Sequence, residues 1–381
     1  MRSGVYVKQE TGYRAFIPAP LPPDPPVTFD REMSRLLSDA DVNLGRLDGV
    51  SSLVPNPDLF VAMYVRQEAL LSSQIEGTEC TLEEVLQFEA DPDGTKRLKD
   101  IGEVVNYVQA MNYGLKRLAD FPLSLRLIRE IHQKLLTGAR GNEREPGEFR
   151  RTQNWIGPPG STLAEATFVP PPAHEMMIAL DNFEKFLYQT ESLPPLIHFG
   201  LAHAQFETIH PFLDGNGRVG RLLITFLLCH RQILQRPMLY LSHFFKLHRQ
   251  EYYDRLMAVR MEGNWEGWLK FFLRGVAQVS NSATDKARAI LRMQEEHRGL
   301  VLDKVSNAAL GQRLLHFLLQ QPIISVRLVE KHLDCAFATA NKLVEQLNGL
   351  GLLTEKTGGQ RNRQYAYQPY LALFIATSAQ A

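Results

Sequence analysis

Cysteine is scarce in this sequence, and several common enzyme motifs are missing. Three cysteines occur among 381 residues, and none belongs to a CxxC pair. This scarcity argues against a disulfide framework or a zinc ribbon and favours a reducing compartment. The sequence also has no Walker A loop, no Rossmann glycine fingerprint and no HExxH zinc motif, which argues against the enzyme classes that those motifs mark.

Neither sign of charge is in excess, and no apolar run is long. Lysine plus arginine and aspartate plus glutamate number 42 each, so we do not expect a surface that binds nucleic acid or an anionic membrane throughout, although a local basic patch stays open. The densest apolar stretch, Leu222–Cys229, is far shorter than the ~20 residues of a membrane-spanning helix. The first residues lack the apolar core of a signal peptide. We expect a cytoplasmic, globular protein of two or three domains with no membrane segment.

Most of the chain shows helical periodicity. Residues 1–30 are rich in proline and should be extended on the surface. Helices are expected over 59–90, 96–118, 124–136, 173–189, 195–208, 216–233, 249–260 and 265–289. The segment 141–172 interrupts them with many glycines and prolines, and its runs TQNWI and ATFV predict a β-hairpin over Gln153–Val169. The predicted fold is therefore mainly α, a helical bundle with one β-hairpin.

Residues 301–381 show a separate pattern. Helical periodicity over 307–320, 326–333 and 338–347 is followed by two strand-like runs, LLTEK and QYAYQ. Three helices followed by a hairpin is the order of a winged helix-turn-helix. We therefore divide the chain into an N-terminal region (1–95), a central domain (96–300) and a winged-helix domain (301–381).

The predicted winged helix has few cations for reading DNA. Its third helix carries one lysine, Lys342, and the wing adds Lys356, Arg361 and Arg363. Major-groove readers usually bring several arginines and amides to the base edges. We therefore expect this domain to serve target docking, dimerisation or completion of the fold rather than DNA binding.

The most informative stretch runs from His210 to Arg221 and reads HPFLDGNGRVGR. A glycine-rich turn here feeds a helix whose N-terminal N–H groups form a site for phosphate. Arg218 and Arg221 share one side of the helix start, where cations oppose the helix dipole unless a polyanion lies among them. Asp214 can hold a divalent cation, and His210 can act as a base near neutral pH. The pattern predicts a phosphoryl- or nucleotidyl-transfer site.

This stretch resembles the signature of the Fic family, H-P-F-x-[D/E]-G-N-G-R-x-x-R, at every fixed position. The resemblance implies a helical protein with a β-hairpin flap that transfers AMP from ATP to a Ser, Thr or Tyr hydroxyl of a protein. It implies that His210 deprotonates the hydroxyl and that Asp214 binds Mg²⁺. It implies that the nucleotide is bound by Asp214, Gly215, Asn216, Gly217, Arg218, Val219, Gly220 and Arg221. Kinase relatives carry lysine where Gly217 stands, so the resemblance points to AMP transfer, with UTP or another donor left open.

A second motif lies N-terminal to the first. Ser72 and Glu76 share one face of a helix that ends at Gly77, so the Glu76 carboxylate lies where the helix dipole disfavours it. Pairing with Arg221 would relieve both charges. The segment resembles the inhibitory motif [S/T]-x-x-x-E-[G/N] of the Fic family, which implies that Glu76 holds Arg221 and blocks the seat of the γ-phosphate. The alternative is that Glu76 makes an ordinary surface contact.

Two further sets of residues are candidates around the motif. The hairpin resembles the Fic flap, whose edge would hold an extended segment of the target, with Ile156 and Gly157 touching the nucleotide or the target. A plain surface hairpin is the alternative. Tyr252, Tyr253 and Arg260 follow on a later helix. They would line an adenine pocket, or else serve as core aromatics and a solvated arginine.

Metal chelation by the histidines near the motif is disfavoured. Glu207 and His210 have a di-iron-like spacing, but no second Glu-x-x-His occurs. We expect His203 in the core or behind the site.

The leading prediction is an adenylyltransferase that uses ATP and Mg²⁺ and is inhibited by its own Glu76. Its partner is a protein that presents a hydroxyl in an extended segment, and the protein itself and a homodimer are candidates. One alternative is the reverse reaction, removal of AMP, in which Glu76 positions a water. Another is a regulator whose central domain senses ATP while the winged helix binds DNA, which salt-sensitive specific binding would reveal.

Overall fold

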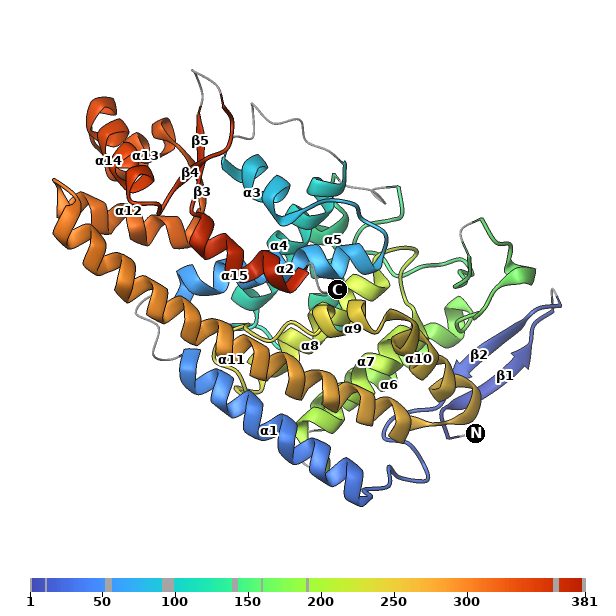
Figure 1. Ribbon diagram of the computed structural model, residues 1–381. Helices are drawn as coiled ribbons and strands as arrows, with labels where there is room; N and C mark the ends of the chain where they lie inside the picture. Colours follow the sequence, from blue (N-terminus) through green and yellow to red (C-terminus); the bar gives the residue numbers. More distant parts are fainter. Residues whose placement is uncertain are drawn as a thin grey trace.

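Helices make up most of the described chain, which confirms the prediction of a mainly α protein (Figure 1). The computed structural model describes residues 2–10, 12–51, 57–90, 99–138, 143–158, 160–189, 192–358 and 363–378. In these ranges the α-helices are α1 (Arg31–Ser51), α2 (Pro57–Ile75), α3 (Leu82–Ala90), α4 (Lys99–Arg117), α5 (Leu125–Leu136), α6 (Ala173–Tyr188), α7 (Pro195–Ile209), α8 (Asn216–His230), α9 (Ser242–Leu247), α10 (Arg249–Glu262), α11 (Trp265–Lys304), α12 (Ala308–Gln320), α13 (Val326–Leu333), α14 (Phe337–Gly349) and α15 (Gln368–Ser378). The strands are β1 (Gly4–Lys8), β2 (Arg14–Pro18), β3 (Ile323–Ser325), β4 (Thr354–Glu355) and β5 (Gln364–Ala366). Among these helices, none combines the length and the apolar character that a bilayer crossing requires.

Helix α11, with 40 residues, is the longest described element and runs along the body of the molecule with α1 packed against it (Figure 1). Asn264 caps its N-terminus by accepting a hydrogen bond from Gly267 N at 2.9 Å. Its buried side chains recur at helical spacing, and Trp268 Nε1 donates to the Gly200 carbonyl of α7 at 2.7 Å. The helix continues through residue 300, where the sequence analysis placed a domain boundary.

Helices α7 and α8 form the buried centre of the protein. Every residue from Leu196 to Ile209 is buried. His203 lies between the Gly220 carbonyl and the Tyr252 hydroxyl, with 2.9 Å from a ring nitrogen to each oxygen. His203 is therefore a core residue. Across the described ranges, no group of three or more His, Cys, Asp or Glu side chains could hold a metal ion.

Residues 308–366 show the order of elements that the sequence predicts for their fold. Helices α12, α13 and α14 precede β4 and β5, and a strand that was not predicted, β3, lies between α12 and α13. The sheet is antiparallel in the order β3-β5-β4. Helix α15 then packs back on the body, where Gln67 of α2 donates to the Phe374 carbonyl at 3.3 Å.

Two cations of the predicted wing are engaged within the protein. Lys356 lies 3.1 Å from Glu83 of α3, and Arg363 lies 3.7 Å from Glu355. Arg361 lies outside the described residues. These pairs reduce the positive charge that this hairpin offers to DNA.

The N-terminal residues form a hairpin that the sequence analysis did not predict. Strands β1 and β2 pair antiparallel, from Gly4 opposite Pro18 to Lys8 opposite Arg14. The hairpin also joins the segment 153–169, because Phe16 N donates to Val169 O at 2.9 Å. The proline-rich pattern indicated extended backbone but not its partner.

The segment 153–169 is looser than the predicted hairpin. Within its described residues a single antiparallel bridge, Ile156 opposite Phe168, joins the two runs, and a short 3₁₀ helix lies between them. A side chain takes part of the role of a strand ladder, since Trp155 Nε1 donates to Ser161 O at 3.0 Å. The antiparallel approach is therefore as predicted, but regular strands are not.

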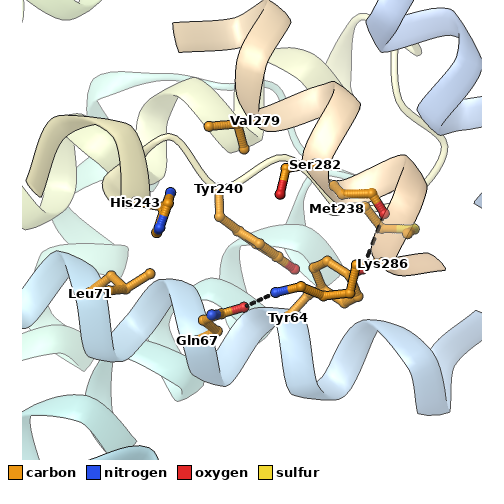
Figure 2. Close-up of a pocket in the computed structure, with 10 residues that line it drawn as sticks. Tyr64, Gln67, Leu71, Met238, Tyr240, His243, Val279, Ser282 and Lys286 are labelled. Carbon is orange, nitrogen blue, oxygen red and sulfur yellow. Dashed lines mark hydrogen bonds between the residues drawn. The ribbon is translucent and has the colours of Figure 1, made fainter. Parts of the chain in front are cut away.

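A pocket lies between α2, α11 and the start of α9 (Figure 2). Tyr64, Gln67 and Leu71 line it from α2, and Lys286 enters from α11, with its ammonium donating to Gln67 Oε1 at 3.2 Å. Burial lowers the pKa of Lys286 to about 8. None of its lining residues belongs to the motif at 210–221, so this pocket is separate from the predicted site.

Candidate functional site

The predicted motif forms a sharp turn between α7 and α8. His210 caps the C-terminus of α7 with a left-handed backbone (φ +50°), and its N–H donates to Phe206 O at 3.0 Å. Gly215 caps the N-terminus of α8 with φ +79°, a conformation that glycine adopts at little cost. The first N–H groups of α8 have no partner within the helix, and Val219, one turn on, is already buried. The turn thus presents backbone donors where the sequence predicts them.

The Asn216 side chain holds this turn closed. Its Oδ1 accepts from Phe212 N at 2.9 Å, and its Nδ2 donates to Phe212 O at 2.8 Å. Asn154 donates to the same carbonyl at 2.9 Å, and the His132 ring stacks on the Phe212 ring with 3.7 Å between centroids. A contact of Asn216 with a nucleotide would therefore use its backbone N–H.

Arg150 anchors the turn from outside, and the sequence analysis missed it. Its guanidinium donates to the His210 carbonyl at 3.0 Å and to the Pro171 carbonyl at 2.6 Å. Its backbone N–H donates to Pro211 O at 2.9 Å, and the side chain is buried. Arg150 belongs to a stretch without periodicity, so no pattern in the sequence indicated that it holds the His210 backbone.

The His210 ring is uncharged at neutral pH. Burial, and then the positive charges of Arg260 and Arg150, lower its pKa to about 3. Its Nδ1 atom is buried and finds no hydrogen-bond partner among the described residues. A neutral imidazole has a nitrogen that can accept a proton, which is the state that a general base requires.

The expected ion pair between Glu76 and Arg221 is present. Arg221 Nη2 lies 2.6 Å from Glu76 Oε1, and the same guanidinium donates to Ser72 Oγ at 2.8 Å and to Ser72 O at 2.9 Å. The Arg221 side chain is 2% exposed and that of Glu76 37%, so this is not an ordinary surface contact. Burial raises the pKa of Glu76, but the Arg221 charge and hydrogen bond outweigh it, and the net pKa is lowered.

Glycines make room for this contact. Gly77 follows Glu76 with φ +96° and lets the chain leave α2. A side chain at Gly217 would collide with the Glu76 carboxylate, and one at Gly220 would collide with the carboxyl group of Glu207. The two glycines of α8 therefore allow α2 and α7 to bring carboxyl groups close to the start of α8.

Arg218 precedes Arg221 by one turn of α8, and its charged contacts are longer. Its Nη1 lies 3.6 Å from Glu103 Oε2, and its Nη2 lies 3.5 Å from Asp214 Oδ1. Its Nε and Nη1 find no hydrogen-bond acceptor among the residues that the structure describes. The side chain is 4% exposed, and a buried guanidinium with unused donors suits a site that binds an anion. The sequence analysis did not single out Glu103, whose position in α4 matches no motif.

Two buried carboxyl groups lie near Arg221 in addition to Glu76. Burial raises the pKa of Glu207 and of Glu68 to about 7 each, although the Arg221 charge acts in the opposite direction. Glu68 accepts a hydrogen bond from the Ser242 hydroxyl, whereas Glu207 Oε1 has no partner among the described residues. The sequence analysis missed Glu68 and considered Glu207 only as a metal ligand.

Asp214 is the candidate magnesium ligand. Its Oδ1 accepts a hydrogen bond from Gly215 N at 2.6 Å, and its side chain is 39% exposed. Mg²⁺ usually takes one or two carboxylates and completes its shell with water and phosphate oxygens. An exposed carboxylate beside backbone donors for phosphate fits that donor set.

The structure separates the three residues expected in an adenine pocket. Tyr252 is buried in the core, whereas the Tyr253 ring is partly exposed. Arg260 is buried rather than solvated, which corrects that alternative. Its Nη2 donates to Glu207 O at 3.0 Å, and its Cζ lies 4.0 Å from the centre of the Phe168 ring. Tyr253 therefore keeps ring surface for a ligand, while Arg260 supports the segment 153–169 from below.

The two candidates in that segment lie at its bridge. Ile156 exchanges backbone hydrogen bonds with Phe168 at 2.8 and 3.0 Å, so its own donor and acceptor are used. Gly157 follows it and is exposed. A side chain at Gly157 would collide with the Ser161 hydroxyl, so packing of the loop itself already favours glycine there.

Two family models match the chain. The Fic/DOC family N-terminal model covers residues 34–116, and the Fic/DOC family model covers residues 122–228. Among curated relatives, the protein adenylyltransferase Fic of Drosophila grimshawi is 31% identical over 217 residues, which are 55% of this chain and 40% of that protein. The protein adenylyltransferase Fic of Culex quinquefasciatus is 31% identical over 219 residues, 55% of this chain and 39% of that protein. The chain thus matches about two fifths of the length of these relatives.

Solved structures share the fold at low sequence identity. A Fic family protein from Desulfovibrio desulfuricans superposes with a TM-score of 0.57 and 18% identity, over 90% of this chain and 97% of that chain. A Fic domain containing signaling protein from Bacteroides thetaiotaomicron superposes with a TM-score of 0.50 and 19% identity, over 68% of this chain and 97% of that chain. At these identities the likeness concerns the fold alone.

Proposed function

The chain is a Fic/DOC family protein with a Fic N-terminal domain and a Fic domain, and from this premise we propose that it transfers AMP from ATP to a hydroxyl group of a protein. The curated relatives that it matches carry the name protein adenylyltransferase. The single observation that carries the proposal is the turn at 210–218, which places a neutral imidazole at one end and a buried guanidinium with unused donors at the other.

The proposed reaction uses these groups in order. His210 accepts the proton of a target Ser, Thr or Tyr hydroxyl. The hydroxyl oxygen attacks the α-phosphorus of ATP, a new P–O bond forms, and the bond from the α-phosphorus to its bridging oxygen breaks, which releases pyrophosphate. The backbone donors of Gly215, Asn216 and Gly217 and the guanidinium of Arg218 would stabilise the charge on the phosphates. Arg150 holds the His210 backbone while the proton moves.

Asp214 would hold magnesium in this reaction. When bound, the ion neutralises phosphate charge and helps to orient the leaving group. The exposed Asp214 carboxylate lies beside Gly215, and Arg218 Nη2 is 3.5 Å from it, so one turn would serve both the ion and the phosphates.

We propose that Glu76 inhibits the reaction. Its carboxylate lies 2.6 Å from Arg221 Nη2, so a γ-phosphate that needs Arg221 must first displace it. The Arg221 charge keeps the pKa of Glu76 below its ordinary value, so Glu76 stays ionised and the brake stays engaged at neutral pH.

Mass spectrometry of the intact protein tests the reaction. Incubation with ATP and magnesium should add the mass of one AMP to the protein itself or to a protein mixture, and UTP, GTP and CTP in parallel report the donor. His210→Ala should reduce transfer by at least about a thousandfold, because it removes the base, and should leave ADP binding intact. His174→Ala, an exposed histidine, is the matched control. Transfer that survives in His210→Ala would refute the assigned base.

Release of the brake is a second measurement. Glu76→Gly should raise the rate of AMP transfer by at least about tenfold, which corresponds to about 1.4 kcal/mol of relieved competition. Glu79→Gly, an exposed glutamate in the loop after α2, is the control and should not change the rate. Equal rates for Glu76→Gly and wild type would sink the inhibitory role. If Glu76→Gly abolishes release of AMP from a modified protein, the reverse reaction is the one that the site performs.

A further inference from the structure

Arg218 is buried among groups that do not use its donors. Its Nε and Nη1 find no acceptor among the described residues, although the side chain is 4% exposed. Leaving such donors unmet costs free energy unless a ligand supplies acceptors. Something must therefore hold the guanidinium in place without occupying it.

Glu103 of α4 is the group that does so. Its Oε2 lies 3.6 Å from Arg218 Nη1, which is close enough for charge attraction and too long for a hydrogen bond. The Glu103 side chain is itself 4% exposed. The contact differs from that of Glu76, whose oxygen lies 2.6 Å from Arg221 and takes up a donor.

Thr78 holds the Glu103 carboxylate at this distance. Thr78 Oγ1 donates to Glu103 Oε2 at 2.9 Å, and both groups are buried. Thr78 follows the turn that ends α2, where its N–H donates to Ser73 O at 3.2 Å. A second tie joins the same loop to α4, because Glu79 N donates to Asp100 Oδ2 at 2.8 Å. The carboxylate is therefore fixed from α4 and from the loop after α2.

We propose that Glu103, held by Thr78, is a positioning residue that aims the Arg218 guanidinium at the second phosphate of the bound nucleotide. The inference rests on the proposed function, since it names how that site binds its substrate. Because Glu103 attracts Arg218 without a hydrogen bond, the open donors remain available to phosphate oxygens.

Binding of adenine nucleotides to the full chain tests this inference separately from catalysis. ADP has a second phosphate but no third, so it reports on Arg218 without competition at Arg221, whereas AMP lacks the group that Arg218 would meet. Isothermal titration with Mg²⁺ should show that Glu103→Gln weakens ADP binding roughly tenfold, as expected for loss of one charge-assisted interaction, and leaves AMP binding unchanged. Thr78→Val should weaken ADP binding by about threefold, since one hydrogen bond to the positioning group is lost.

A double-mutant cycle and a matched control sharpen the test. Arg218→Gln should weaken ADP binding, and Glu103→Gln added to it should cost no more, because the two residues act through one contact. Glu84→Gln is the control, because Glu84 makes the same kind of Thr–Glu hydrogen bond, with Thr81 at 2.9 Å. It should bind ADP and AMP as the wild type does.

Several outcomes would overturn the inference. Equal weakening of ADP and AMP by Glu103→Gln would show a general structural role, and tighter ADP binding would make Glu103 a competitor of phosphate. If Glu103→Gln does not fold, Thr78→Val decides by the same comparison of ADP with AMP. A wild-type protein that binds ADP through Arg218 but never transfers AMP would refute the proposed function and leave the positioning role standing.

Discussion

Two arginines that lie one turn apart at the start of α8 are in opposite states. Arg221 is in contact with Ser72 and Glu76 at 2.6 to 2.9 Å, whereas the recorded charged contacts of Arg218 are 3.5 and 3.6 Å. Both side chains are almost fully buried, and both charges oppose the helix dipole. The difference teaches that a buried cation at a helix start needs an anion, which the protein supplies to one arginine and leaves to a ligand at the other.

The surrounding helices explain the difference. Helix α2 ends beside Arg221, and the bare backbone of Gly217 lets the Glu76 carboxylate approach. Helix α4 passes Arg218 at a greater distance, and Thr78 binds the Glu103 carboxylate that would otherwise reach closer. The loop after α2 therefore brings one carboxylate close and holds another back.

The largest expected effect comes from removing each arginine in turn. Arg221→Met should lower the free energy of unfolding by about 3 kcal/mol, because Glu76 and Ser72 lose their partner. Arg218→Met should change it by less than about 1 kcal/mol, because the lost charge had unused donors. Urea unfolding without nucleotide measures both variants. Similar losses in the two variants would break the comparison.

A pH series examines the Arg221 side, where not every carboxyl group is ionised. The pKa of Glu207 is raised from 4.5 to about 7, so the folded protein holds a proton that the unfolded chain has lost between these values. Its stabilising contribution is present below pH 4.5 and is lost as the pH rises through about 7. Glu207→Gln stays neutral, so relative to the wild type it should gain about 2 kcal/mol between about pH 5 and pH 8.

Urea unfolding at several pH values measures this gain. Glu295→Gln, whose side chain is 77% exposed, is the control and should show no comparable dependence. A stability difference between Glu207→Gln and wild type that does not vary with pH would mean that Glu207 is charged in the folded protein.

The smallest expected effect sharpens the comparison with nucleotides. In the wild type, ATP and ADP should bind within about threefold of each other, because the third phosphate finds Arg221 occupied. In Glu76→Gly, ATP should bind about tenfold more tightly than ADP, while ADP itself binds as before through Arg218. Isothermal titration of both proteins with Mg²⁺ measures the ratios. An ADP affinity that also rises in Glu76→Gly would show that the two arginines are not independent.

Some elements were predictable from the sequence because their signals are local. The bounds of α13 are the predicted ones, and α8 begins at Asn216 as expected, since an apolar stripe and a glycine turn mark them. Helix α1 was missed although its buried residues recur at helical spacing, as Met33, Leu36 and Ala40 show. Helix α15 has no polar stripe for periodicity to reveal. Its apolar surface is explained by its packing against α2 and α11.

What the sequence by itself determined is the turn and its chemistry. The order of residues from His210 to Arg221 specifies a glycine cap, a helix start, a base, a carboxylate and two guanidiniums, because each of these depends on neighbours within a few positions. The tertiary structure alone decided that Arg150 holds the His210 backbone, that Glu103 faces Arg218, and that Arg260 is buried beneath Phe168. Those contacts join segments far apart in the chain, and their distances follow from how whole helices pack, which no local pattern encodes.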